Sequence, residues 1–209
     1  MGPIAVALTT YTAAAALLTV TPGLDTALVL RTAAAGSVRP AVLAALGIVA
    51  GCFSWAVLVS LGLGAVLVAS HVAYSILRWV GAGYLLWLGY QMLRYPRQDF
   101  AINTGGPKRD RTAFATGLLT NLLNPKVGIF YVSFLPQFVP KGVPVARFML
   151  LLGGIHALLG LIWFASLIAA TRPISRFLCR PAVLKGCDRL TGGLFLTFGL
   201  GLALESRRP

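Results

Sequence analysis

The sequence predicts an all-α integral membrane protein with six transmembrane helices, arranged as two inverted three-helix repeats. Hydrophobic residues make up 57% of the 209-residue chain and charged residues only 11%, with a mean hydropathy of +0.83. This composition lies far from that of a soluble domain, and the length suits about six spans with short loops. Two apolar runs are too long for one span, and each is interrupted by a proline, at Pro22 and at Pro125. The first helix of each repeat is therefore predicted to be broken.

The first half of the chain contains the first broken helix and two further spans. Residues 4–35 would form a straight helix of roughly 48 Å, well beyond the ~30 Å hydrocarbon core of a bilayer. Pro22 removes a backbone donor, and Gly23 has little helix preference. We expect a span over 4–20, an unwound elbow, and a half-helix ending near residue 35. Further spans are predicted at about 41–69, with Gly47 and Gly51 as a small-residue packing face, and at about 75–93.

The second half repeats this plan after a basic loop at 95–111. The apolar run 112–139 would be roughly 42 Å long as one helix, and Pro125 breaks it. A fifth span is predicted at about 145–170, then a basic stretch at 172–189 and a short last span at 190–204. The chain is thus expected to be a single transmembrane domain over 1–209, with repeat one at about 1–95 and repeat two at about 112–205.

An internal alignment supports the repeat. The heptapeptide Gly83–Gly89 (GYLLWLG) aligns with Gly193–Gly199 (GLFLTFG), with three of seven positions identical. Because each half has an odd number of spans, the second half must enter the membrane from the opposite side. In such inverted repeats the broken helices meet near the midplane, around the substrate.

The net charge of +13 indicates a membrane orientation rather than a nucleic-acid partner. Lys and Arg lie mainly between the spans, as expected for the positive-inside rule and for contact with anionic lipid. The face of the first, third and fifth loops holds twelve of them, and the other face holds five. This asymmetry predicts both termini outside, in a bacterial-type cytoplasmic (inner) membrane.

The sequence offers little support for an enzyme, a cofactor or a metal site. Cys52, Cys179 and Cys187 are scattered and form no CxxC, and there is no cluster of His, Asp and Glu. GxSxG, P-loop and HExxH motifs are absent. The partners we expect are a small-molecule substrate, protons and membrane lipid, with a homo-oligomer left open and no nucleic acid.

Asp25 and Lys126 are the candidate site residues, because they are the charges placed deepest in the apolar runs. A charge at mid-bilayer costs about 2.5–3.5 kcal/mol even on lenient scales. Asp25 would sit in the first turn of a half-helix, where the helix dipole favours an anion. Lys126 would also sit at the start of a half-helix, where the dipole repels a cation. It is therefore predicted to bind a substrate carboxylate or to pair with Asp25. The alternative is a structural ion pair that joins the two repeats.

Further polar groups flank the breaks. Thr21, Pro22, Gly23, Asn124 and Pro125 are predicted to complete the binding site with Asp25 and Lys126. Thr19 and Asn121 are expected to satisfy freed backbone groups instead.

His156, in the fifth span, has two readings. It could make an interhelical hydrogen bond, or it could carry a proton. Asp25 is the other candidate proton carrier, because loss of water favours the neutral form of a carboxylate.

These motifs resemble the LysE/RhtB family of amino-acid exporters. The resemblance rests on the Pro22-Gly23 break with Asp25, Gly36 and Arg39 after it, on Gly47, Gly51 and Gly62, on the Gly81–Gly89 segment, on the run Gly117–Lys126, and on Phe134-Leu135-Pro136-Gln137-Phe138. Leu24 departs from the family pattern, which usually has a second proline there. The resemblance implies export of amino acids or close derivatives, coupled to the proton gradient.

A competing interpretation is a membrane scaffold or assembly subunit with no transport activity. It would explain the apolar spans but leaves Asp25 and Lys126 without a task.

Overall fold

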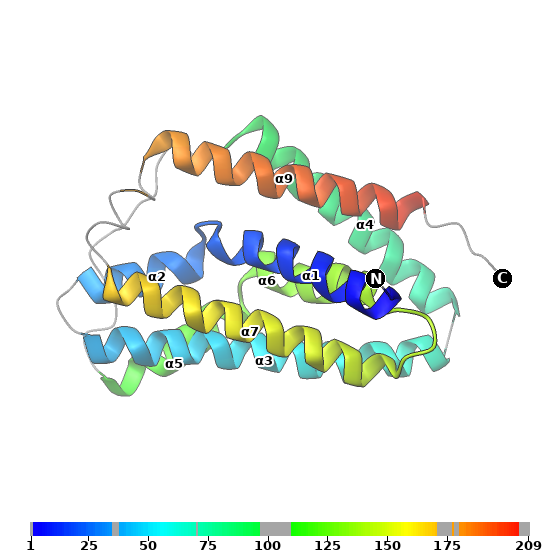
Figure 1. Cartoon of the computed structure of the whole chain (residues 1–209), viewed down its shortest axis with the longest axis horizontal. Helices are drawn as coiled ribbons and strands as arrows, with labels where there is room; N and C mark the ends of the chain where they lie inside the picture. Colours follow the sequence, from blue (N-terminus) through cyan, green and yellow to red (C-terminus); the bar gives the residue numbers. More distant parts are fainter. Residues whose placement is uncertain are drawn as a thin grey trace.

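The chain forms a bundle of helices that run back and forth along one long axis (Figure 1). The computed structural model describes residues 2–34, 38–69, 71–96, 110–170, 177 and 180–204. Within these ranges the secondary structure is entirely helical. The elements are α1 (Pro3–Val20), α2 (Leu24–Ala34), α3 (Val38–Ala69), α4 (His71–Arg94), α5 (Asp110–Leu122), α6 (Pro125–Ile129), a π-helix (Phe130–Phe134), a 3-10 helix (Leu135–Phe138), α7 (Val145–Ala169) and α9 (Pro181–Leu204).

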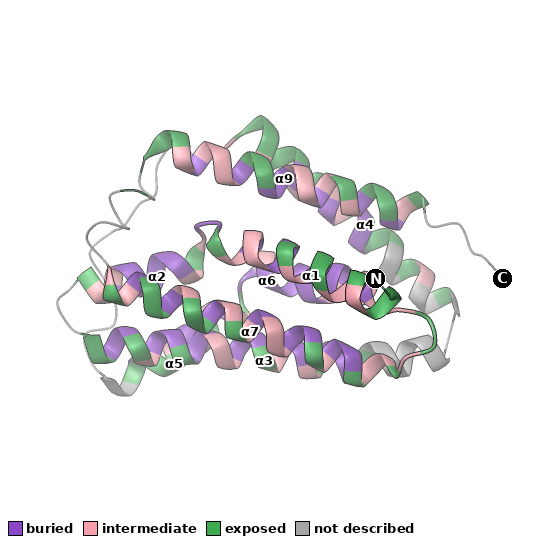
Figure 2. Cartoon of the chain, viewed as in Figure 1, coloured by how far each residue is buried: buried purple, intermediate pink, exposed green. Residues whose placement is uncertain are grey.

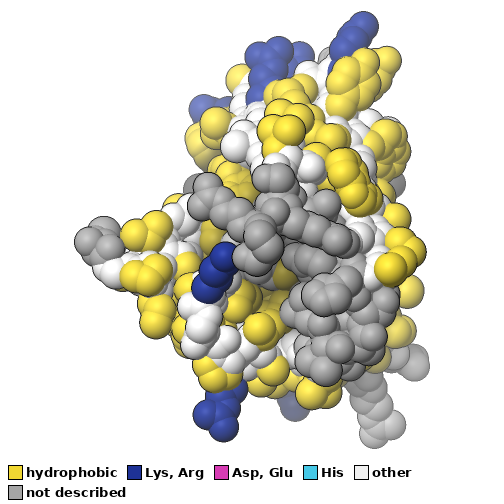
Figure 3. Space-filling view, turned by 90° about the vertical axis from the view of Figure 1, so that its right-hand side faces the viewer, with side chains coloured by type: hydrophobic (Ala, Val, Ile, Leu, Met, Phe, Trp, Pro, Cys, Tyr) yellow, Lys and Arg dark blue, Asp and Glu magenta, His cyan; other side chains and the backbone are white. Residues whose placement is uncertain are grey.

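The helices identify a multi-pass membrane protein. Among the described residues, four helices are long and apolar enough to cross a bilayer: α1, the Val38–Gly62 part of α3, α7 and α9. The segments Thr112–Leu122 and Lys126–Phe138 meet the same test as a pair, bent by 54°. Large apolar side chains face outward, and hydrophobic groups cover much of the end face in Figure 3. The expected basic loop at 95–111 and the stretch at 172–180 fall largely outside the described residues, as does Gly36.

The first break lies where the sequence predicts it. α1 ends at Val20 and α2 begins at Leu24, so Thr21, Pro22 and Gly23 form the elbow between them. Pro22 cannot continue the hydrogen-bond ladder of α1. Asp25 lies in the first turn of α2, as expected.

The second break is confirmed, but the segment after it is not a simple half-helix. Asn124 caps α6, with its side chain accepting a hydrogen bond from the Lys126 backbone N–H at 3.1 Å. After one turn the backbone widens into the π-helix and then tightens into the 3-10 helix. Pro136 has no N–H for this ladder, and the Gln137 side chain donates instead to the Ser133 carbonyl at 2.7 Å.

The expectation of a short last span starting at residue 190 is wrong. α9 begins nine residues earlier, at Pro181, so 181–189 are helical. Its inner face continues through Leu184, Asp188, Thr191 and Phe195, all buried and spaced as one helical stripe. The basic residues between these positions concealed the stripe in the sequence.

Glycines allow two close helix contacts in the bundle. α3 packs on α5 through Gly47, where an added Cβ would lie 2.8 Å from the Leu118 backbone N, and through Gly117, which lies against Ala44. Figure 2 shows the buried positions along these inner faces. Aromatic residues of the π-helix fill the centre, where Phe130, Tyr131 and Phe134 are fully buried.

α4 and α9 pack against each other in a symmetric way. A Cβ on Gly89 would lie 2.8 Å from Gly192 O and 2.9 Å from Leu196 Cγ. A Cβ on Gly199 would lie 3.2 Å from Ala82 O and 2.9 Å from Leu86 Cγ. Each contact becomes the other when residue numbers are shifted by 110, the offset of the sequence alignment. Buried, half-buried and exposed positions also agree between 81–90 and 191–200, except at Gly83 and Gly193.

The α3–α5 contact predicts different outcomes for one substitution at two glycines of α3. Gly47→Ala should destabilise the protein by about 1–3 kcal/mol, because the new methyl group collides with the α5 backbone. Gly62→Ala should be neutral or gain up to about 1 kcal/mol, because nothing lies within 4 Å of the added Cβ. Thermal unfolding in nanodiscs measures both, and equal melting temperatures would contradict the packing argument.

Candidate functional site

The two helix breaks share one pocket. It is a cavity of about 50 Å³ with walls from the elbow, α3, the second break and α7. By volume it would hold only a few water molecules. Its wall includes six of the predicted site residues: Thr21, Gly23, Asp25, Asn124, Lys126 and His156. Pro22 and Pro125 contribute the breaks that bring these groups together.

Asp25 is held by the second half of the chain. Its carboxylate accepts hydrogen bonds from Asn121 Nδ2 at 2.8 Å and from Asn124 Nδ2 at 3.4 Å. The N-terminal turn of α2 adds the favourable end of a helix dipole. The carboxylate is therefore stabilised within the bundle by two amides and a helix end.

Lys126 is held by the first half of the chain. Its Nζ donates long hydrogen bonds to Leu18 O at 3.5 Å and to Thr21 O at 3.4 Å. These carbonyls belong to the C-terminal end of α1 and to the elbow, where carbonyls lack helical partners and the dipole favours a cation. Lys126 lines the same pocket as Asp25. Its own helix end repels the ammonium group, and the end of α1 compensates.

His156 makes the predicted interhelical hydrogen bond. Its Nδ1 lies 3.0 Å from the Tyr131 hydroxyl and joins α7 to the π-helix. The ring also lies 5.0 Å from the Phe130 ring centroid and borders the pocket. A role as proton carrier stays a prediction.

Thr19 and Asn121 behave differently from each other. Thr19 Oγ1 donates to Ala15 O at 2.7 Å, the backbone role expected for it. Asn121 is fully buried and bonds the Asp25 carboxylate, so its assignment to the backbone alone is wrong.

Three residues of this region were missed in the sequence. Cys52 lines the pocket with its Sγ 3.4 Å from Asn121 Nδ2, and its position after Gly51 on the packing face was the available signal. Tyr131 carried no signal, because nothing marks one aromatic in an apolar run. Thr191 Oγ1 lies 2.7 Å from Thr21 Oγ1 at the elbow, but it falls in a span whose start was misplaced.

Comparison with known proteins places this arrangement in a family. Residues 16–206 match the family model described as LysE type translocator. The chain belongs to the LysE type translocator family. It is accordingly a translocator of a bacterial membrane rather than an enzyme.

Several relatives of this LysE-type chain have been named for efflux. The threonine efflux protein of Escherichia coli (strain K12) is 35% identical over 195 residues, covering 88% of this chain and 91% of the relative. The leucine efflux protein of Enterobacter sp. (strain 638) is 31% identical, covering 93% of each. The homoserine/homoserine lactone efflux protein of Salmonella typhimurium is 29% identical, covering 92% and 94%. No solved structure shows a significant match.

The buried hydroxyls near the pocket predict a contrast between two tyrosines. Tyr131→Phe should cost about 1–3 kcal/mol, because it leaves His156 Nδ1 buried without its partner. Tyr11→Phe should be neutral or stabilising, because the buried Tyr11 hydroxyl has no partner among the described residues. Thermal unfolding of the two variants in the same lipid tests this, and an equal loss in both would contradict it.

Proposed function

We propose that this chain is a secondary active exporter of amino acids or close derivatives, which it binds at the pocket between the two breaks. The main support is that one anion and one cation, Asp25 and Lys126, meet at this pocket from opposite halves of the chain. An amino acid presents an ammonium and a carboxylate a few ångströms apart. Asp25 suits the ammonium, and Lys126 suits the carboxylate. The named relatives export threonine, leucine and homoserine or its lactone, which agrees with this substrate class.

In this proposal the substrate replaces contacts within the protein. The substrate carboxylate accepts a hydrogen bond from Lys126 Nζ, which then no longer donates to Leu18 O and Thr21 O. Those two hydrogen bonds are long, at 3.4–3.5 Å. The freed carbonyls can then accept from the substrate ammonium, beside Asp25. A cavity of about 50 Å³ must widen for this, so binding requires the elbow to move.

We extend the proposal to the topology, with six spans in two inverted repeats. The symmetric α4–α9 contact supports this topology. It joins the last helix of each half, and its two sides are related by the same shift of 110 residues. α4 has 24 residues, which gives about 36 Å of helix and is enough to cross the core. Figure 1 shows the chain reversing direction along the long axis, with the start of α1 and the end of α9 at the same end.

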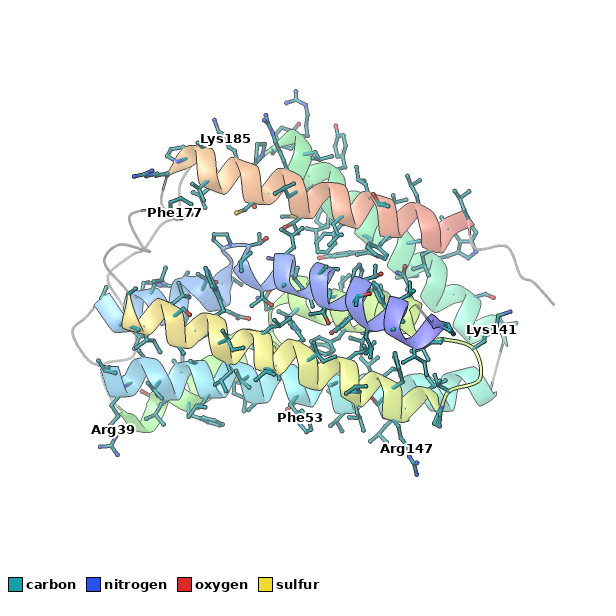
Figure 4. The ribbon with its side chains drawn as sticks, viewed as in Figure 1. Arg39, Phe53, Lys141, Arg147, Phe177 and Lys185 are labelled. Atoms are coloured by element: carbon teal, nitrogen blue, oxygen red, sulfur yellow. The ribbon has the colours of Figure 1, made fainter. Side chains whose placement is uncertain are left out.

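The proposed orientation puts both termini outside the cytoplasm, in the inner membrane. In Figure 4 the labelled basic residues lie at the two ends of the bundle, Arg39 and Lys185 at one and Lys141 and Arg147 at the other, with Phe53 between them. The excess of Lys and Arg in the loops on the side of Arg39 and Lys185 favours that side as cytoplasmic.

Transport should depend on both charges of the pocket. Lys126→Ala and Asp25→Asn should each reduce substrate efflux to background, because each removes the partner of one substrate charge. The matched control is Lys141→Ala, an exposed lysine in the turn before α7, which should leave efflux unchanged. Labelled threonine, leucine and homoserine in proteoliposomes provide the assay. Normal efflux by both site variants would refute the assignment, and no efflux by the unaltered protein would favour a scaffold.

We also propose that efflux is coupled to protons, with Asp25 as the carrier. When the substrate ammonium leaves to the outside, Asp25 takes up a proton there, and it releases that proton inward before it binds substrate again. The Asn121 and Asn124 amides can donate hydrogen bonds to the side-chain oxygens of Asp25 whether Asp25 is ionised or protonated. His156 is the rival carrier and also lines the pocket.

Counterflow separates the two carriers, because exchange of labelled for unlabelled substrate needs no proton gradient. A residue that only carries the proton should lose gradient-driven efflux but keep exchange when it is neutralised, whereas Asp25, which in this proposal also binds the substrate, should lose both. We expect His156→Gln to keep both activities. If Asp25→Asn loses both and His156→Gln loses only the driven mode, His156 carries the proton and Asp25 is purely a substrate ligand.

A further inference from the structure

One glycine in the wall of the binding pocket is not required by the packing of the helices. Gly160 lies on α7 and is buried in the wall of the pocket between the two breaks. An added Cβ would lie 3.7 Å from Phe164 Cε2 and 3.9 Å from Val49 Cγ2, which are ordinary van der Waals distances. At Gly153, two turns earlier, an added Cβ would instead collide with Ala56 of α3. Helix packing therefore explains the glycine at 153 but not the one at 160, where the missing side chain leaves space in the pocket.

Gly160 belongs to a stripe of pocket residues on one face of α7. His156, Gly160 and Phe164 follow at intervals of four residues, and all three line the pocket. Ile48 lines it from α3, which packs alongside α7 (Figure 1). Ile48 and Phe164 share one buried hydrophobic cluster, and Val49 packs against that cluster. The pocket therefore has an apolar end, formed by Ile48, Gly160 and Phe164.

The charged groups of the pocket come from the two breaks instead. Among the described residues of the pocket wall, Asp25 is the only acid, and Lys126 is the only lysine or arginine. A substrate whose ammonium and carboxylate groups engage these two side chains has its α-carbon between them. Its side chain must then occupy another part of the pocket, and the apolar end offers no charge to pair with it.

We propose that Ile48, Gly160 and Phe164 form the subsite for the substrate side chain, and that this subsite selects amino acids whose side chain is uncharged and mainly aliphatic. The inference rests on the proposed transport function. An aliphatic group gains free energy on leaving water for this end of the pocket, whereas a charged group would lose its hydration without gaining a partner. The close contact of Gly153 with Ala56 holds α7 on α3, so the subsite keeps its shape while the pocket widens at the elbow. Gly160 then limits the length of side chain that fits.

Adding one methyl group to the subsite tests this assignment. Gly160→Ala introduces a Cβ without a collision, so the protein should fold and its melting temperature should not fall. We expect kcat/KM for leucine efflux to fall about tenfold or more relative to that for threonine, because leucine has the longer side chain. The matched control is Gly154→Ala, the same change on the same helix but outside the pocket wall, with nothing within 4 Å of the added Cβ. It should leave the ratio unchanged.

A compensating substitution separates a specific subsite from a general effect on the protein. Phe164 Cε2 is the atom nearest to the Cβ added at 160, so Phe164→Leu returns the space that the methyl group takes. The double variant Gly160→Ala with Phe164→Leu should recover the ratio of leucine to threonine efflux. A ratio that does not change in Gly160→Ala, or that falls equally in Gly154→Ala, overturns the subsite and leaves the transport function standing.

Thermal stabilisation by ligand gives a readout that does not depend on transport. Saturating leucine should raise the melting temperature of the unaltered protein in detergent, because it binds only the folded state, and lysine should not. Gly160→Ala should lose most of the shift with leucine and keep the shift with threonine. Equal stabilisation by lysine and leucine overturns the selection of uncharged side chains. If no amino acid is exported or shifts the melting temperature, the proposed function itself is refuted.

Discussion

Unsatisfied backbone groups at two helix breaks are the constraint on which this structure depends. Within a bilayer no water is available to them, and each unpaired group costs several kcal/mol. Here the second half of the chain supplies a partner for backbone groups of the first half and two amides for a carboxylate of the first half. Lys126, from the second break, bonds Leu18 O and Thr21 O at the end of α1. Asn121 and Asn124 bond Asp25 at the start of α2. These contacts hold the two breaks together and so help to fix how the two halves dock.

The same contacts explain why a site built this way can respond to a ligand. A carboxylate that approaches Lys126 competes with two backbone carbonyls, and an ammonium that approaches Asp25 competes with two amides. In the proposed function, substrate binding would therefore loosen the elbow that these contacts hold in place. The elbow in turn contacts α9 through Thr21 and Thr191. The contacts at the pocket are linked in this way to the packing of α9, a helix from the other half.

The sequence predicted the parts of the fold that follow from proline chemistry and span length. Pro22 and Pro125 end helices wherever they fall, so both breaks and the meeting of Asp25 with Lys126 could be expected. The start of α9 could not, because Lys185 and Arg189 interrupt the apolar signal although Leu184 and Asp188 face inward. Tyr131 depends on the wide turn of the π-helix, which directs its hydroxyl to His156. No local pattern specifies a π-turn, so tertiary packing decides it.

The halves match in packing but differ in charge, and the substrate class gives a reason. Aligning Pro22 with Pro125 puts Gly23 opposite Lys126 and Asp25 opposite Gly128. Each charged side chain thus has a glycine as its counterpart in the other repeat. A fully symmetric site would hold each charge twice or not at all, and two like charges so close in a bilayer would repel strongly. A zwitterion needs one group of each sign. If the proposed amino-acid site is correct, this difference in charge between the halves is what it requires.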